Sequence, residues 1–195
     1  IADLGGCLRN KEGDFLNSRG GFLKDDEIKT IEIKKDLIES IPTNNKICGI
    51  SWKSSRPKNG SQRSIPLKKF IMMLNLKGYS FISLQYGDTT KEINEIKDKL
   101  GIDIISYNKV DNFTDIDGLA SLVQACDTVI SVDNITCQIA GALGKKAYLL
   151  LSANHWWGWM TEGNDSLWYS SIKLYRLGKL NDWSDVFKKI KVDLK

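Results

Sequence analysis

The sequence predicts an α/β protein whose mostly parallel sheet is covered by helices on both faces. Short apolar runs alternate with amphipathic helix patterns along the chain. The runs are nearly continuous in hydrophobicity, which is typical of strands buried on both faces. Residues 127–151 contain one complete unit: an apolar run, a polar turn, a short helix of small residues, a glycine and a second apolar run. Strands that alternate with helices in this way form parallel sheets.

The N-terminal part of the chain predicts a connecting segment followed by the first units of the sheet. Residues 1–24 are glycine-rich and weakly periodic, so we interpret them as a connection from a missing N-terminal region. The predicted domain is therefore 25–195. Asp25-Asp26 opens a helix that Pro42 follows, and the inward face is expected to carry Ile28, Ile31, Leu37, Ile38 and Ile41. A strand over 46–51, a polar loop over 52–64 and a helix from about Ser64 to Leu74 come next.

The remaining elements follow the same alternation. We predict strands over 79–84 and 102–106, helices over 89–100 and 115–125, and the two strands of the 127–151 unit. Thr89 and Glu92 have the spacing of a capping box, and Gly101 is expected to end that helix. A final helix is expected to begin near Asp182–Asp185. The whole pattern predicts five or six parallel strands in a Rossmann-like, three-layer domain.

Composition excludes several classes of protein. The 195 residues suffice for one domain with a sizeable core, and a net charge of +4 is too mild to indicate nucleic-acid binding. No apolar stretch approaches the roughly 20 residues of a membrane span, and no signal-peptide pattern opens the chain. The chain does not begin with Met, so a fragment of a longer protein is expected. We expect a cytoplasmic protein without a transmembrane segment.

The cysteine and histidine content argues against a metal site. Cys7, Cys48, Cys126 and Cys137 form no C-x-x-C pair and lie mostly in apolar patterns. They are interpreted as small buried hydrophobic residues in a reducing compartment. The chain has a single histidine, His155, so a Cys/His zinc site is not expected. No metal or other cofactor is predicted.

Candidate binding residues follow the ends of the predicted strands, where parallel sheets bind ligands. The loop 52–64 carries cations and hydroxyl groups that suit a diphosphate, namely Lys53, Ser54, Ser55, Lys58, Arg63 and Ser64. A solvated loop without a ligand is the alternative. After the next strand, Gln85 and Tyr86 suit the edge and the face of a nucleobase. A plain strand-to-helix turn explains them equally simply.

The turn at Asp133-Asn134 is the strongest candidate. Asn134 suits the N-cap of the following helix, whose first N–H groups can hold a phosphate. Asp133 ends a buried strand, so its carboxylate needs partners. Sugar hydroxyls would serve, and so would N–H groups of a neighbouring loop. Further along, the tryptophans at 156, 157 and 159 either cover a sugar or base or pack the tail onto the sheet.

An ordered series of short motifs resembles the C-terminal half of glycosyltransferase family 9 proteins, the heptosyltransferase relatives. The resemblance is strongest to the version often fused to tetratricopeptide repeats, and it spans about residues 20–190. The matching pieces are Gly49-Ile-Ser-Trp52, Arg63-Ser-Ile-Pro66, Phe81-Ile-Ser-Leu-Gln85, Asp115-Ile-Asp-Gly-Leu-Ala120, Val129-Ile-Ser-Val-Asp133, Ile139-Ala-Gly-Ala-Leu-Gly144, Trp157-Gly-Trp159 and Ser166-Leu-Trp-Tyr169.

The resemblance implies one lobe of the two-lobed glycosyltransferase B architecture, the lobe that binds the nucleotide-sugar donor without an obligatory metal. It implies that Lys53, Ser54 and Arg63 face the donor phosphates. Asp133 and the amides from Asn134 onward, through Ile135 and Thr136, would hold the sugar and phosphate side. The catalytic base and the acceptor site would lie mainly in the missing N-terminal lobe, so the catalytic residues stay unassigned. Oriented donors of this kind stabilise a departing nucleoside diphosphate.

Two residues depart from the family pattern. Gln138 stands where the family commonly has His, and glutamine cannot carry a positive charge toward a phosphate. Leu167 replaces a proline that usually precedes Trp-Tyr.

The hypothesis is the donor-binding half of an inverting, heptosyltransferase-like glycosyltransferase, inactive as a fragment because half of the cleft is missing. One alternative is a degenerate lobe that serves as a protein-interaction module. Another is a sugar-nucleotide epimerase, whose carboxylates would have to be Asp88 and Asp117. Both of these carboxylates also suit helix starts.

Overall fold

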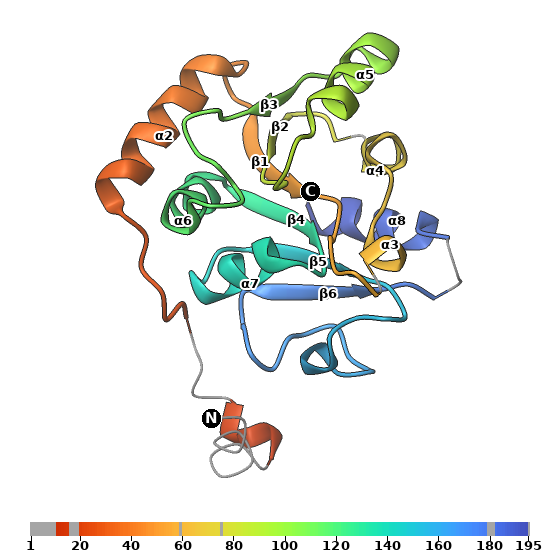
Figure 1. Cartoon of the computed structure of the whole chain (residues 1–195). Helices are drawn as coiled ribbons and strands as arrows, with labels where there is room; N and C mark the ends of the chain where they lie inside the picture. The colour runs from red at the N-terminus through yellow and green to blue at the C-terminus, as the bar shows by residue number, and fades with distance from the viewer. Residues whose placement is uncertain (1–10, 16–19, 59, 75, 179–181, 195) are drawn as a thin grey trace.

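The computed structural model describes residues 11–15, 20–58, 60–74, 76–178 and 182–194. Within them, six strands form a single, wholly parallel sheet in the order β3-β2-β1-β4-β5-β6 (Figure 1). The predicted Rossmann-like parallel sheet is therefore confirmed. The strands are β1 (Lys46–Ser51), β2 (Tyr79–Ser83), β3 (Ile104–Ser106), β4 (Thr128–Val132), β5 (Ala147–Leu151) and β6 (Ile172–Arg176).

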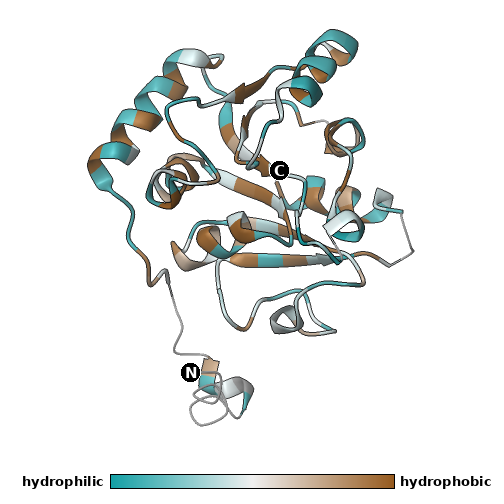
Figure 2. Ribbon diagram, viewed as in Figure 1, coloured by the Kyte–Doolittle hydropathy of each residue, from teal (hydrophilic) through white to brown (hydrophobic). Residues whose placement is uncertain are grey.

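Helices cover both faces of the sheet, and two buried clusters make up the core (Figures 1 and 2). One cluster joins the sheet to α2, α6 and α7, and the other joins it to α4, α5 and α8. Consecutive residues of one strand belong to opposite clusters, as Tyr148 and Leu149 of β5 do. The helices are α2 (Glu27–Ser40), α3 (Gly60–Arg63), α4 (Leu67–Leu74), α5 (Thr90–Leu100), α6 (Ile116–Ala125), α7 (Ile135–Ala142) and α8 (Ser184–Asp193), with 3-10 turns η1 (Glu12–Phe15) and η2 (Trp157–Trp159).

The inward face of α2 differs from the prediction. Ile33 and Leu37 are buried against α6 and the sheet, whereas Ile28, Ile31 and Ile38 are 73%, 68% and 55% exposed. The predicted set therefore mixed two faces: Leu37 is buried as expected and Ile41 packs against the same core, whereas Ile33 was omitted. Asp26 accepts a hydrogen bond from the amide of Lys29 at 3.1 Å, which explains why the helix begins there.

The capping box predicted at α5 is also absent. Thr89 makes no side-chain cap bond, and Asp88 instead accepts a hydrogen bond from the amide of Thr90 at 2.9 Å. That bond holds the pKa of Asp88 below its usual value. The Glu92 carboxylate instead forms an ion pair with Lys53 and accepts a hydrogen bond from the Trp52 indole. The predicted stop at Gly101 is confirmed, since its φ of 64° is the left-handed conformation that glycine adopts without strain.

The predicted burial is confirmed for Cys48, Cys126 and Cys137, which are free thiols in the structure. Burial raises the pKa of the Cys126 thiol to about 12, so it is protonated and inert at neutral pH. Cys7 lies outside the described residues. Among the helices that the structure describes, none combines the length and the apolar character that a bilayer span requires.

Candidate functional site at the carboxyl edge of the sheet

The strand order reverses direction between β1 and β4, so this is the switch point of the sheet. From β1 the chain moves outward through β2 and β3, then returns to pair β4 with β1. Open parallel sheets bind ligands in the crevice beyond the carboxyl ends of the strands at such a point. The loop 52–64 leaves β1 there, and the turn at Asp133-Asn134 leaves β4 beside it.

Asn134 joins the two strand ends. Its side-chain oxygen accepts a hydrogen bond from the amide of Thr136 at 3.0 Å, which is the predicted N-cap of α7. Its Nδ2 donates to the hydroxyl of Ser51 at 2.7 Å and to the carbonyl of Lys53 at 2.9 Å. The start of α7 is therefore fixed against the beginning of the loop that follows β1.

Gln85 fixes the same loop from the other side. The side chain is 3% exposed, and its Oε1 accepts hydrogen bonds from the amides of Trp52 and Lys53 at 2.9 and 2.8 Å. A third bond comes from the hydroxyl of Ser51 at 3.1 Å. The side chain thus supports the loop 52–64 and does not extend into solvent.

Asp133 and Arg63 form an ion pair in the interior, with 2.7 Å between Oδ2 and Nη1. The carboxylate also accepts hydrogen bonds from the amide of Trp156 at 2.7 Å and from the indole of Trp159 at 2.9 Å. Arg63 Nε donates to the carbonyl of Asn154 at 2.6 Å. The partners that Asp133 requires thus come from Arg63 and from the segment after β5, including a backbone N–H of that segment.

Lys53, in the same loop as Arg63, is also paired. Its Nζ is 2.6 Å from Glu92 Oε1, and the two side chains are 37% and 40% exposed. Glu92 Oε2 accepts a hydrogen bond from the indole of Trp52 at 2.8 Å. Glu92 therefore neutralises the charge of Lys53.

The other predicted residues lie near these two pairs and differ in exposure. The amide of Ser54 donates to the hydroxyl of Ser64 at 3.0 Å, which closes the loop 52–64 on itself. Ile135 is 48% exposed at the first turn of α7, whereas Thr136 is fully buried. Gln138 lies one turn further along α7, and its Oε1 accepts a hydrogen bond from the Tyr169 hydroxyl at 2.8 Å.

Two more basic residues belong to this loop: Lys58, which the sequence indicated as a group that suits a diphosphate, and Arg56, which it did not. Arg56 and Lys58 are exposed, and neither forms an ion pair with any residue that the structure describes. Sequence does not reveal which cations of a loop acquire carboxylate partners. It therefore could not predict that Lys53 and Arg63 are paired whereas Arg56 and Lys58 are exposed.

A polar pocket of about 500 Å³ lies between the loops that follow β2 and β3. Asn112 lines it and donates to the carbonyls of Ser83 and Gln85, both at 3.2 Å. The Oδ1 atom of Asn112 is buried and has no hydrogen-bond partner among the residues described. Phe113 also lines the pocket and is 66% exposed, and the centre of its ring lies 6.3 Å from that of Tyr86.

The aromatic segment after β5 lies against the Arg63–Asp133 pair. Arg176 donates to the carbonyls of Trp159 and Met160 at 2.5 and 2.9 Å, and burial lowers its pKa. Trp159 is 1% exposed, whereas Trp157 is 70% exposed. The segment therefore both packs onto the sheet and presents one indole to solvent. His155 approaches Arg176 at 3.4 Å and contacts none of the predicted ligand residues in the interactions described.

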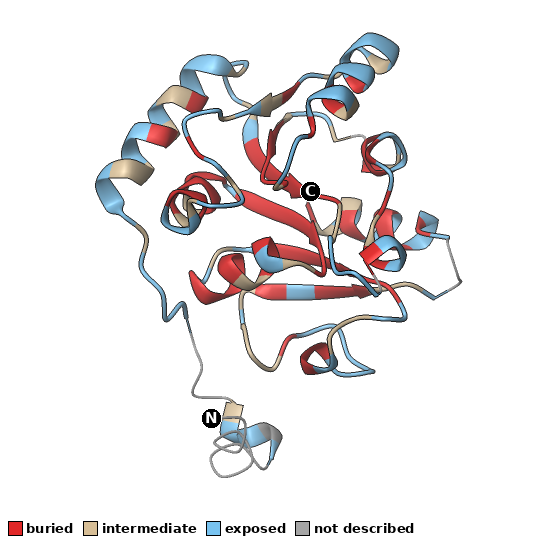
Figure 3. Ribbon diagram, in the orientation of Figure 1, coloured by how far each residue is buried: buried red, intermediate tan, exposed pale blue. Residues whose placement is uncertain are grey.

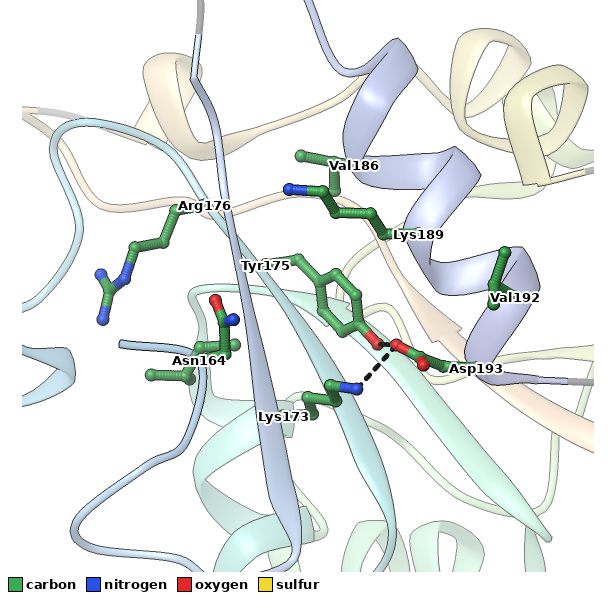
Figure 4. A pocket seen from close by; sticks show the side chains of 9 residues that line it. Asn164, Lys173, Tyr175, Arg176, Val186, Lys189, Val192 and Asp193 are labelled. Carbon is green, nitrogen blue, oxygen red and sulfur yellow. Dashed lines mark hydrogen bonds and ion pairs between the residues drawn. The ribbon is translucent and has the colours of Figure 1, made fainter. Parts of the chain in front are cut away.

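A separate pocket of about 380 Å³ lies between β6 and α8, at the edge of the sheet (Figure 4). Asp193 accepts hydrogen bonds from Tyr175 and from Lys173, the latter at 2.9 Å. These bonds lower the pKa of Asp193, the Lys173 bond most strongly. The pocket contains none of the residues predicted as ligands and lies outside the switch point.

Comparison with known proteins supports one fold. No protein-family model matches the chain. Protein FlbA of Caulobacter vibrioides is 30% identical over 194 residues, which is 94% of this chain and 32% of FlbA. The chain therefore spans about a third of that curated relative.

Solved structures match over most of this chain. The Escherichia coli ADP-heptose lipopolysaccharide heptosyltransferase II gives a TM-score of 0.60 at 14% identity, covering 88% of this chain and 52% of that one. A glycosyltransferase family 9 protein from Veillonella parvula gives 0.57 at 13%, covering 88% and 46%. E. coli heptosyltransferase WaaC, solved with ADP, gives 0.53 at 11%, covering 83% and 48%. The chain has the fold of half a glycosyltransferase family 9 heptosyltransferase. This fold is that of one lobe of the glycosyltransferase B architecture, so the predicted fold class is confirmed.

Proposed function

We propose that the chain is the donor-binding half of an inverting, heptosyltransferase-like glycosyltransferase, and that a nucleoside diphosphate sugar binds at the β1–β4 switch point. The observation that carries the proposal is the junction of the loop 52–64 with the start of α7, through Asn134 and the Arg63–Asp133 pair. The heptosyltransferase fold supports it. Acceptor and catalytic base are expected from the rest of a longer protein, together with any tetratricopeptide repeats.

The phosphates are proposed to lie over the loop 52–64. Arg56 and Lys58 are the exposed cations there, and Lys53 joins them when it leaves Glu92. Arg63 stabilises the loop and does not bind the phosphates directly, because its charge is already paired with Asp133. Cations placed at this edge stabilise the charge that develops on a departing diphosphate. The proposal includes no metal ion.

The nucleobase is proposed to occupy the pocket between the loops after β2 and β3. The unpartnered Oδ1 of Asn112 supports this assignment, since an amino group of a base would satisfy it. Tyr86 and Phe113 offer aromatic faces for stacking. Gln85 contributes indirectly, by holding the loop 52–64. The buried thiols of the chain agree with a cytoplasmic location, which we also propose.

Isothermal titration with nucleoside diphosphates and their sugars tests the proposal. Because half of the cleft is missing, we expect a Kd on the order of 0.1–1 mM for one base. Arg56→Ala with Lys58→Ala should weaken binding about tenfold, and Phe113→Ala should weaken it by a similar factor through lost stacking. Lys188→Ala, on α8 and paired with Asp185, is the matched control. Absence of heat with every compound at millimolar concentration would overturn the proposal.

A second candidate function is a degenerate lobe that serves as a protein-interaction module. The observation that favours it is the pairing of Lys53 and Arg63 with carboxylates, which leaves neither charge uncompensated. The same titration separates the two functions. A module of this kind would bind no nucleotide sugar, and the Arg56 and Lys58 substitutions would leave that result unchanged.

A further inference from the structure

Two exposed apolar side chains border the proposed donor site beside the end of β4. Ile135, the first residue of α7, is 48% exposed, and Trp157, in the η2 turn, is 70% exposed. Ile135 follows Asp133 by two residues. Trp157 follows Trp156, whose amide donates to the Asp133 carboxylate at 2.7 Å. Figure 3 shows exposed segments before and after η2. An indole is therefore presented to solvent close to the start of α7.

Aromatic contacts connect Trp157 to the side of α7. Its ring lies 6.5 Å from that of Trp168, in an edge-to-face arrangement. The next residue, Tyr169, packs against α7, because a Cβ added at Gly141 would lie 2.4 Å from the Tyr169 ring. The Tyr169 hydroxyl donates to Gln138 Oε1 at 2.8 Å. Trp157 thus belongs to the aromatic cluster that contacts Gln138.

Most polar side chains at this end of β4 already have protein partners. Both carboxylate oxygens of Asp133 are bonded, and the Asn134 amide is bonded through its oxygen and its nitrogen. Gln138 differs, because only its Oε1 is bonded, and its Nε2 has no partner among the residues that the structure describes. Residues three apart on a helix are neighbours, so Gln138 lies beside Ile135. We call Ile135, Gln138 and Trp157 the rim.

The order of the loops along the sheet edge indicates which part of the donor meets the rim. The strands follow the order β3-β2-β1-β4, so the pocket after β2 and β3 comes first, the loop 52–64 second and the rim third. The proposed function, on which this step rests, puts the base in the pocket and the phosphates over the loop. Because the diphosphate joins the nucleoside to the sugar, the sugar reaches the rim.

We propose that the donor carries an N-acylated deoxy sugar, with an acetamido group in place of a ring hydroxyl. Ile135 and Trp157 contact the acyl methyl group and the apolar face of the ring, and Gln138 Nε2 donates to the acyl carbonyl. Aromatic and aliphatic side chains give a hydroxyl group no partner, and a polar group buried without one costs binding free energy. A sugar with a hydroxyl group at every position is therefore disfavoured.

Isothermal titration with three matched ligands tests the class of sugar. They are the nucleoside diphosphate that binds most tightly in the titration above, its glucose derivative and its N-acetylglucosamine derivative. The two sugars differ only in a hydroxyl or an acetamido group on one carbon. We expect the acetamido ligand to bind about tenfold more tightly than the glucose ligand, as for a small apolar group that fits its contacts. Equal affinities, or tighter binding of the glucose ligand, would overturn the inference.

Three variants test whether the rim causes this preference. Trp157→Ala and Ile135→Ser should each bring the ratio of the two Kd values close to one and leave the Kd of the nucleoside diphosphate itself unchanged. Gln138→Glu keeps an acceptor for the Tyr169 hydroxyl but replaces the Nε2 donor with an oxygen, so it should also abolish the preference. Met72→Ala, at a 56% exposed site on α4, is the control and should change neither quantity.

The outcomes separate this inference from the proposed function. A nucleoside diphosphate that binds without any preference for the acetamido sugar contradicts the inference alone. A preference that all three variants retain also contradicts it, and would leave Trp157 as a contact for another partner. If no nucleoside diphosphate binds at millimolar concentration, the proposed function fails and the inference fails with it.

Discussion

Arg63 Nη1 lies 2.7 Å from Asp133 Oδ2, and the two side chains are only 7% and 4% exposed. This pair joins α3 to the carboxyl end of β4, and Trp156 and Trp159 attach the segment after β5 to the same carboxylate. Both carboxylate oxygens of Asp133, and Nε and Nη1 of Arg63, therefore have protein partners before any ligand arrives. The pair is an element of the fold at the position where the sequence suggested a ligand group.

Removing Arg63 should destabilise the domain strongly. Arg63→Met leaves the Asp133 carboxylate buried with two hydrogen bonds and no counter-charge, and breaking a buried pair in this way costs about 3–5 kcal/mol. Lys109→Met, which breaks the exposed Lys109–Asp36 pair, should cost at most about 1 kcal/mol. Urea denaturation of the two variants and the parent chain measures the difference. Equal free energies of unfolding for the two variants would show that the Arg63–Asp133 pair is dispensable.

Releasing Lys53 should strengthen donor binding if the proposed function is correct. Glu92→Gln keeps the shape of the side chain and removes the charge that neutralises Lys53 at 2.6 Å. We expect the Kd for a nucleoside diphosphate to fall about threefold to tenfold, as for one added charge-assisted contact. Glu95→Gln, on the same helix and paired with Lys99, is the control. An unchanged Kd in the Glu92 variant would place the phosphates away from Lys53.

Acid sensitivity should depend partly on Asp115, the N-cap of α6. A bond from Lys29 at 2.9 Å and the amide of Gly118 at 2.8 Å hold the pKa of Asp115 below its usual value. A carboxyl whose folded pKa is lowered contributes stability above its unfolded pKa, about 3.9, and loses it as pH falls through the folded pKa. Unfolding free energies should therefore decline less steeply below about pH 4 in Asp115→Asn than in the parent chain.

Lys29→Met provides the matched test of that linkage. It removes the largest cause of the lowered pKa, so it should reduce the same acid-dependent component, by at most about 1 kcal/mol for a pair this exposed. The double variant should show no further reduction. Identical pH profiles for the parent and Asp115→Asn would exclude this carboxyl as a contributor.

Sequence predicted five of the six described strands, because each of the five is a short, mainly apolar run next to polar or glycine residues. The run 46–51 coincides with β1, and 127–151 contains β4, α7 and β5 close to their predicted limits. Two elements were missed. β6 follows an aromatic segment without clear strand spacing, and α3 is a single turn within a polar loop.

Partners of the charged residues were the part that sequence could not predict. Lys53 and Glu92 lie far apart in the sequence, and so do Arg63 and Asp133. Which of these residues pair is therefore decided only by the folded chain. The spacing from Thr89 favoured a capping role for Glu92. In the structure, the Glu92 carboxylate instead pairs with Lys53 and accepts a hydrogen bond from the Trp52 indole. The prediction of the inward face of α2 was partly wrong for a related reason, because the helix has isoleucines on two faces and both sets follow helical spacing.

The aromatic segment should be sensitive to a single added methyl group at Gly158. This residue is buried, and a Cβ there would collide with the ring of Trp156, whose amide binds Asp133. Gly158→Ala should therefore displace Trp156 and destabilise the domain by about 1–3 kcal/mol. Gly178→Ala is the control, since a Cβ at Gly178 has no neighbour within 4 Å. Urea denaturation and tryptophan fluorescence measure both effects. A parent-like emission spectrum and stability in the Gly158 variant would show that the segment can move away from the sheet without cost.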